Sequence, residues 1–313
     1  MQDWNDYQSQ NKERFLDELL GLLRIPSVSA DSKYSKDVAR AAEFIKERLI
    51  EAGAENVEVC PTKGHPIVYG DKLIDPKLPT VIVYGHYDVQ PAEPLELWTS
   101  PAFEPTIRDG KLFARGSVDD KGQLWVHVKA LEAHLAVRGT LPCNVIVLAE
   151  GEEEVGSEHL APFIEQHKKR LACDGVVISD SAMFAPGIPS ILSSLRGLAY
   201  FEINVEGPNS DLHSGMYGGA VVNPGMALGR ILATFHDAKG KVAIKGFYDG
   251  IRPFSAHVRK GMKQLPFKDT TFMRELGVKA LGGEPGYTTL EKLWTRPTCE
   301  VNGLRSEEHT SEL

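Results

Sequence analysis

Thr80-Val-Ile-Val-Tyr-Gly-His-Tyr-Asp88 is an apolar run that ends on a histidine and a carboxylate. Two further segments have the same form, Asn144-Val-Ile-Val-Leu-Ala-Glu-Gly-Glu-Glu-Glu154 and Gly175-Val-Val-Ile-Ser-Asp180. Continuous apolar runs of this kind are typical of strands that are buried on both faces of a sheet. The three segments therefore predict central strands whose carboxyl ends carry polar side chains.

Helix patterns lie before and between these runs. Apolar residues recur every three or four positions over residues 15–23, 38–49 and 124–135, as they do on the buried face of an amphipathic helix. Strand and helix patterns that alternate along a chain indicate an α/β fold in which helices cover a sheet.

The pattern changes after Arg196-Gly197. Over residues 199–205 apolar and polar side chains alternate, which predicts an antiparallel strand with one exposed face, and a helix is expected over residues 225–235. We therefore expect a second domain, with the boundary near Leu195.

The composition excludes several classes of protein. The 313 residues are 42% hydrophobic and carry a formal net charge of −8, so nothing favours nucleic acid, whose phosphates require clustered Lys and Arg. No stretch has the roughly 20 apolar residues that a membrane span needs, and the start lacks a signal-peptide pattern, so a cytoplasmic protein without membrane contact is expected. The sequence has no glycine-rich nucleotide motif and no Gly-x-Ser-x-Gly motif, and its four cysteines are far apart.

The polar ends of the three runs form one candidate site. In an open α/β sheet the carboxyl ends of the strands form the ligand crevice, so His86, residues 152–154 and Asp180 converge there, beside Asp119-Asp120 at the start of the intervening helix. Each alone has an ordinary structural explanation as a turn residue or a helix cap. Together the carboxylates would repel one another unless cations neutralised them. Imidazole with several carboxylates is a ligand set for zinc, cobalt or manganese, whereas calcium would not recruit a histidine.

Several motifs, in this order, carry a resemblance to a known family: Tyr84 to Pro91, Trp98 to Phe103, Arg108 to Gly122, Glu150 to Ser157 and Ser210 to Gly219. From about residue 10 to Leu304 the chain resembles the aminoacylase, carboxypeptidase and dipeptidase family of co-catalytic metallopeptidases. The form Asp-Val-Gln-Pro is most similar to the carnosinase-like cytosolic dipeptidases. The resemblance implies a catalytic domain with a helix-covered mixed sheet, interrupted by a smaller α+β lid domain that also makes a homodimer contact.

The resemblance implies two divalent metal ions, with zinc expected and manganese or cobalt as alternatives. His86, Asp119 and Asp180 would hold one ion, and Asp119 and Glu154 the other, so that Asp119 bridges them. The family also has a cis peptide after the bridging aspartate, which places one at Asp119-Asp120.

The resemblance also implies three catalytic roles. Asp88 would accept the second imidazole proton of His86 and so fix its tautomer. Glu153 would be the general base, because a base must reach the attacking water without being a ligand itself. His213, in the lid of a partner subunit, would stabilise the tetrahedral oxyanion.

The resemblance divides the chain into a catalytic domain over 1–195, a partial lid over 196–304 and a polar tail over 305–313 that is unlike the family. The family completes its second metal site with a histidine beyond the lid, whereas the match stops at Leu304. His309 in the tail is a poor substitute, since nothing around it would hold the ring. We therefore expect the chain as written to be inactive or nearly so.

The expected reaction is hydrolysis of a peptide or amide bond in a small substrate, most simply a dipeptide. Two alternatives remain open. The first is an amidohydrolase that deacylates N-acyl amino acids on the same scaffold. The second is a metal-poor, catalytically inactive fragment that keeps the fold and serves only in association. Metal content and a substrate panel would separate them.

Overall fold

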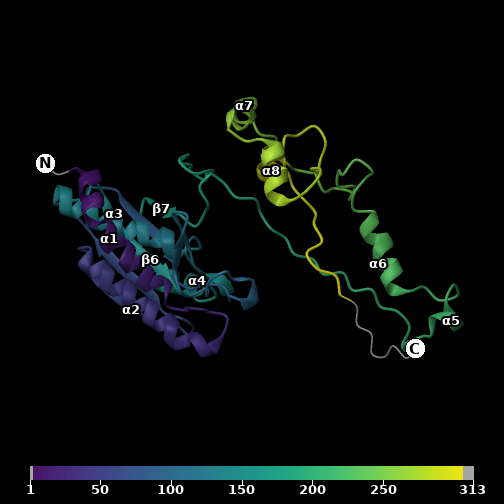
Figure 1. Cartoon of the computed structure of the whole chain (residues 1–313), viewed down its shortest axis with the longest axis horizontal. Coiled ribbons are helices and arrows are strands. Elements are labelled where there is room, and N and C mark those ends of the chain that lie inside the picture. Colours follow the sequence, from purple (N-terminus) through teal and green to yellow (C-terminus); the bar gives the residue numbers. More distant parts are fainter. Residues whose placement is uncertain (1–2, 306–313) are drawn as a thin grey trace. The chain divides into compact units, whose positions relative to one another are not determined.

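A mixed sheet lies in the first of the two units into which the chain divides, Met1–Ser190 and Ile191–Leu313. The computed structural model describes residues 3–305 (Figure 1). The strand order is β1-β2-β6-β3-β7: β3 pairs in parallel with β6 and β7, whereas β2 is antiparallel to β1 and β6. The strands are β1 (Glu55–Cys60), β2 (Ile67–Lys72), β3 (Thr80–His86), β6 (Asn144–Glu150) and β7 (Gly175–Ile178).

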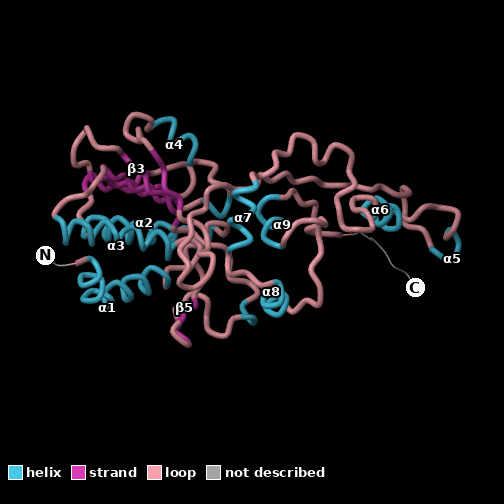
Figure 2. The backbone as a smooth tube through the Cα atoms, turned by 90° about the horizontal axis from the view of Figure 1, so that it is seen from above, coloured by secondary structure: helices cyan, strands magenta, loops and turns pink. Residues whose placement is uncertain are grey.

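Helices cover both faces of this sheet, with α1, α2 and α3 on one side and α4 on the other (Figure 2). They are α1 (Trp4–Leu23), α2 (Ser35–Glu51), α3 (Lys121–Arg138) and α4 (Leu160–Gln166). Shorter elements are η1 (Ser32–Tyr34), η2 (Leu95–Leu97), η3 (Glu153–Val155) and the hairpin β4 (Thr106–Arg108) with β5 (Lys111–Phe113). The expected helix-covered mixed sheet is confirmed, and so are the three helices predicted for this unit.

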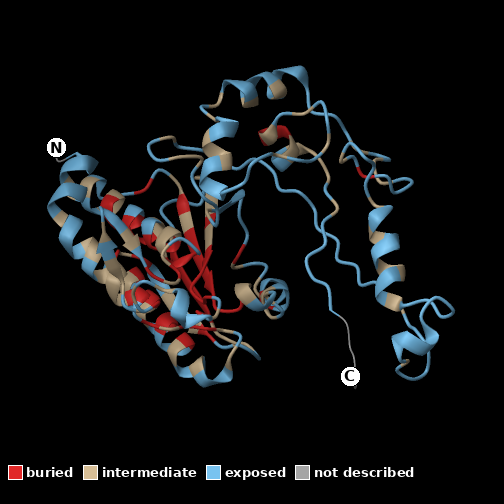
Figure 3. Ribbon diagram, turned by 45° about the vertical axis from the view of Figure 1, so that its right-hand side comes forward, coloured by how far each residue is buried: buried red, intermediate tan, exposed pale blue. Residues whose placement is uncertain are grey.

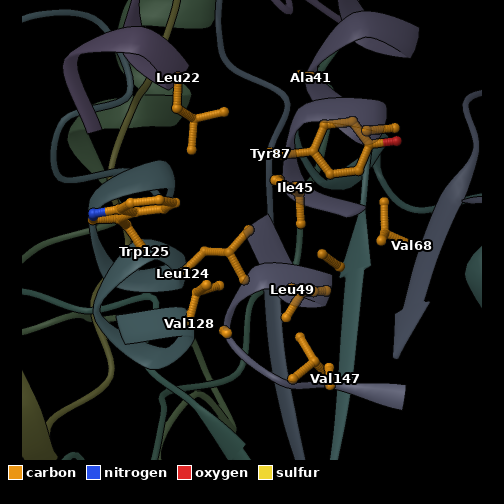
Figure 4. Packing of buried hydrophobic residues seen from close by; sticks show 14 of the residues in the cluster. Leu22, Ala41, Ile45, Leu49, Val68, Tyr87, Leu124, Trp125, Val128 and Val147 are labelled. Carbon is orange, nitrogen blue, oxygen red and sulfur yellow. The ribbon is translucent and has the colours of Figure 1, made fainter. Parts of the chain in front are cut away.

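Each central strand supplies side chains to two cores. Val68 and Val147 belong to the core that α2 and α3 cover, where Trp125 packs (Figure 4). Their neighbours Ile67 and Ile146 belong to the core on the other face. Successive side chains of a strand point to opposite faces, so a strand between two helical layers must be apolar at every position. Buried residues are accordingly concentrated in these strands and the facing sides of the helices (Figure 3).

Two adjacent residues of α2 test this packing. Leu49 is fully buried, whereas Ile50 is 52% exposed. We expect Leu49→Ala to lower the free energy of unfolding by about 2–5 kcal/mol, because it leaves a cavity under the helix. Ile50→Ala should change it by less than about 0.5 kcal/mol. Chemical denaturation of the two variants measures both values, and equal effects would contradict the described orientation of α2.

The strand β7 differs from the burial predicted for it. Its residues are exposed throughout, with Val176 at 56% and Ile178 at 62%. The prediction of burial on both faces is therefore wrong for this strand. β7 is an edge strand, and no strand within residues 3–305 pairs with its outer side, so it lacks the neighbours that bury β3 and β6.

The described part of the second unit is helical and irregular. Its helices are α5 (Ser214–Tyr217), α6 (Pro224–Ala233), α7 (Ala256–Gln264), α8 (Asp269–Leu276) and α9 (Thr289–Thr295). α6 corresponds to the helix expected over residues 225–235. The antiparallel strand expected over residues 199–205 is wrong, because this segment has no regular secondary structure. A strand requires a neighbour for its backbone hydrogen bonds, and no strand in the described part of the unit offers them.

The longest described helices are α1, α2 and α3. None of them is both long and apolar enough to cross a membrane.

Candidate metal centre

The sheet topology gathers the candidate ligands at one edge. β3 lies between β6 and β7, so the carboxyl ends of the three parallel strands are adjacent. His86 is the last residue of β3, Glu153 and Glu154 follow β6 in η3, and Asp180 follows β7 by two positions. Asp119 comes two residues before α3, and its peptide bond to Asp120 is cis.

The imidazole of His86 is at the centre of the cluster. Its Nε2 is 3.2 Å from Oδ1 of Asp119, 3.6 Å from Oδ2 of Asp180 and 3.9 Å from Oε2 of Glu153. Two groups of side chains have their ligand atoms within 4.8 Å of one another: His86 with Asp119 and Asp180, and His86 with Glu153 and Glu154. The structure thus brings together all four predicted ligands and the predicted base.

The donor set fits a metal ion. His86 is fully buried, and its Nδ1 lies 3.1 Å from the backbone oxygen of Asp88 and 3.3 Å from Oδ1 of that residue. When the ring is neutral, the oxygens beside Nδ1 place its proton there, which leaves a lone pair on Nε2. That Nε2 is buried and makes no hydrogen bond in the described chain. A buried lone pair that points at three carboxylates and has no donor suits a divalent cation.

The electrostatics of the cluster favour positive charge at the same point. Burial alone would lower the pKa of His86, but the hydrogen bond to Asp88 and the charges of Asp88, Asp120 and Glu153 raise it to about 10. Burial raises the pKa of Glu153 and of Glu154, and neighbouring carboxylates add to both shifts. Without a cation the site must hold protons, whereas a bound cation would neutralise the same carboxylates.

Asp88 does more than orient the imidazole. It is fully buried, and its two carboxylate oxygens accept the backbone N–H groups of Glu153, at 3.3 Å, and Glu154, at 3.1 Å. The same side chain therefore fixes the ring of His86 and the turn that carries both glutamates. The resemblance implied only the first of these contacts.

Gln90 is a site residue that the sequence reasoning did not include. Its Nε2 donates to Oε2 of Glu154 at 2.8 Å and to the backbone oxygen of Glu154 at 3.2 Å. The signal was the Asp-Val-Gln spacing, since residues two apart on extended chain project to the same side. Gln90 therefore restrains the Glu154 carboxylate, in addition to the contact that Asp88 makes with the Glu154 backbone.

Glu152 lies outside the cluster, although it is adjacent in sequence to Glu153. Its Oε1 accepts the backbone N–H of His65 at 3.1 Å, and its Oε2 is 2.7 Å from Nδ1 of His159. A Cβ on Gly64 would come within 1.7 Å of the same Oε1. Glu152 thus holds the turn at residues 64–65, which separates it from its two neighbours in the acidic run.

A substitution at Glu152 tests this separation. We expect Glu152→Ala to leave the metal content of the protein unchanged and to lower the free energy of unfolding by about 1–3 kcal/mol, because it leaves two partly buried donors unpaired. Glu158→Ala, at an exposed position in the same segment, is the control and should be nearly neutral. Metal analysis and chemical denaturation give both values. Loss of metal from Glu152→Ala would contradict this separation, because it would show that metal binding depends on the Glu152 carboxylate or on the turn at residues 64–65.

His213 is in the second unit and was predicted to act in catalysis. It is exposed and caps the N-terminus of α5, where its Nδ1 accepts the backbone N–H of Gly215 at 3.0 Å. Its catalytic role stays a prediction. His309 is outside the described residues.

A helix-covered mixed sheet with a buried histidine and carboxylates at its strand ends defines an α/β fold with a candidate metal site. The chain belongs to peptidase family M20/M25/M40, whose sequence model matches residues 82–306. The predicted resemblance to the co-catalytic metallopeptidases is thereby confirmed.

Several characterised proteins are similar to this chain. The Cys-Gly metallodipeptidase dug1 of Schizosaccharomyces pombe is 32% identical over 94% of the chain, and the Beta-Ala-His dipeptidase of Homo sapiens is 31% identical over 76%. The chain spans 64% of the length of the first and 48% of the second. The solved structure of the M20 family metallo-carboxypeptidase Sso-CP2 from Sulfolobus solfataricus has a TM-score of 0.75 and 31% identity, with 95% of this chain and 67% of that chain covered.

Proposed function

We propose that this chain forms the metal-binding part of a dipeptidase that uses two divalent ions, zinc by expectation, to hydrolyse small peptides. The observation that carries the proposal is the buried, unpaired Nε2 of His86 among the carboxylates of Asp119, Asp180 and Glu153. Relatives named as Cys-Gly, Beta-Ala-His and cysteinylglycine-S-conjugate dipeptidases support small dipeptides as the substrate class.

The residues that would hold the ions are His86, Asp119 and Asp180 for one, and Asp119 and Glu154 for the other. When bound, such ions supply Lewis-acid polarisation of the substrate carbonyl and a lowered pKa of water.

Glu153 would perform the proton transfers. Its raised pKa suits a base that takes a proton from water and returns it to the leaving amine. Asp88 would keep Glu153 in place through its backbone N–H. The division of roles between Glu153 and Glu154 rests on the motif, since both carboxylates are near His86.

The proposal includes a homodimer in which His213 of one subunit donates to the oxyanion in the other. In a chain extended with the family segment beyond the lid, His213→Ala should then lower kcat by about 10²–10³-fold with little change in KM, because a donor aimed at developing charge contributes little to substrate binding. Mixed dimers of His213→Ala and Glu153→Ala chains should recover part of the activity. A lack of recovery in verified mixed dimers would argue against a donated histidine.

Metal analysis combined with a substrate panel tests the proposed function. The protein is loaded with Zn²⁺, dialysed, analysed for bound metal and incubated with Cys-Gly, β-Ala-His and an N-acetyl amino acid. Bound zinc supports the proposal, and so does cleavage of the dipeptides once the family segment beyond the lid has been added to the chain. Cleavage of the N-acetyl amino acid alone would favour a deacylase, and absence of bound metal would favour a non-catalytic protein that keeps the fold.

A further inference from the structure

The proposed ligand Asp180 lies on a segment that has few restraints. It follows β7, which pairs only with β3 and is exposed along its length. The Asp180 carboxylate is still 31% exposed, with its Oδ2 at 3.6 Å from Nε2 of His86. The position of this carboxylate therefore depends on what holds the backbone just after β7.

His127 in α3 makes the contact that holds it. The Nε2 of His127 is 2.7 Å from Oγ of Ser179, the residue directly before Asp180. Within the described chain this is the one side-chain hydrogen bond that joins residues 179–181 to another element. Burial lowers the pKa of His127, which favours the neutral ring, with one nitrogen that donates and one that accepts.

The helix that carries His127 is itself anchored at the metal cluster. α3 begins at Lys121, directly after Asp119-Asp120, and packs on β3. Lys121 is fully buried and donates to the backbone oxygens of Leu22 and Ile25. One rigid helix thus fixes Asp119 through its first residues and reaches the turn before Asp180 through His127.

We propose that His127 is a positioning residue for Asp180, acting through Ser179 on the ion held by His86, Asp119 and Asp180. The inference rests on the proposed function, because it concerns the same site. It assigns a role to a histidine that belongs to none of the sequence motifs.

Zinc affinity of the whole chain, measured by competition with a chromophoric chelator, tests this role. His127→Leu should bind zinc about tenfold more weakly, since contacts that orient metal ligands typically contribute 10–100-fold to affinity. Ser179→Ala should show the same loss. The double variant should lose no more than either single one, because both remove one hydrogen bond. His127→Gln keeps a side-chain amide that can donate, and should restore the affinity to within about threefold of the unaltered chain.

His134→Leu is the matched control. His134 is on the same helix but packs against the ring of Trp4, with centroids 4.7 Å apart, so the same change there should leave zinc affinity unaltered. If the unaltered chain binds no zinc, the proposed function fails and the inference with it. If that chain binds zinc, and the folded His127→Leu and Ser179→Ala variants bind it equally well, only the positioning role is overturned. Additive losses in the double variant would also overturn it. If His127→Leu does not fold, the zinc affinity of Ser179→Ala alone tests the positioning role.

Discussion

Replacing Asp119 by alanine is expected to abolish stoichiometric metal binding. A bridging carboxylate serves both ions, so its loss leaves neither ligand set complete. Affinity should fall by more than about 100-fold, because even residues that only orient ligands contribute 10–100-fold. The Asp119 side chain is 57% exposed, so the variant should keep its fold. Metal analysis after dialysis and a far-UV circular dichroism spectrum measure the two properties together.

Asp17→Ala is the control for Asp119→Ala. Asp17 is an exposed aspartate on α1, and its loss removes the same charge without touching the cluster. Its metal content should equal that of the unaltered chain. One fully retained ion per chain in Asp119→Ala would contradict a bridging role and would leave Asp119 as a ligand of one ion only.

Glu153→Gln is expected to remove hydrolysis without removing metal, whereas Glu154→Gln is expected to remove one ion and hydrolysis with it. Loss of a general base typically lowers kcat by about 10²–10⁴-fold. An amide at position 153 keeps the shape of the side chain but cannot take a proton from water. At position 154 the amide replaces an anionic ligand, so one ion should be lost together with the activity.

The two glutamine variants control for each other, because the substitution is the same at adjacent positions of η3. Metal content is measured for both, beside hydrolysis of Cys-Gly and β-Ala-His. If Glu153→Gln loses metal while Glu154→Gln retains it without turnover, the motif has been assigned one residue out of register. The metal content alone makes this distinction, whatever the rate of the unaltered chain.

The central part of the fold could be predicted from the sequence because local pattern and burial agree there. Val81 to Val83 and Val145 to Val147 are apolar at every position, and helices cover both of their faces. The same pattern predicted that β7 is buried, whereas it is exposed. Burial depends on neighbours that lie elsewhere in the chain. β1 and β2 were not predicted. Glu55 to Cys60 mixes charged and apolar residues, so its own pattern does not indicate a strand. Its strand conformation depends on pairing with β2.

The sequence predicted which residues at the strand ends form the candidate site. It predicted fewer of the contacts that these residues make. His86 ends β3, Asp180 follows β7 and Asp119 precedes α3, so the topology brings them together. Glu152 is set apart from its neighbours by its partners His65, which is distant in sequence, and His159, which lies beyond the acidic run. The contact of Gln90 with Glu154 likewise depends on tertiary structure.

The contacts of Asp88 also limit how such a site can change during evolution. One buried carboxylate is shared by the ring of His86 and by the backbone of Glu153 and Glu154. A substitution at position 88 would therefore disturb the proposed metal ligands and the proposed general base in a single step. Metal preference and turnover cannot be adjusted independently at this position. Substitutions that change the substrate are therefore expected at residues near the site that do not contact Asp88.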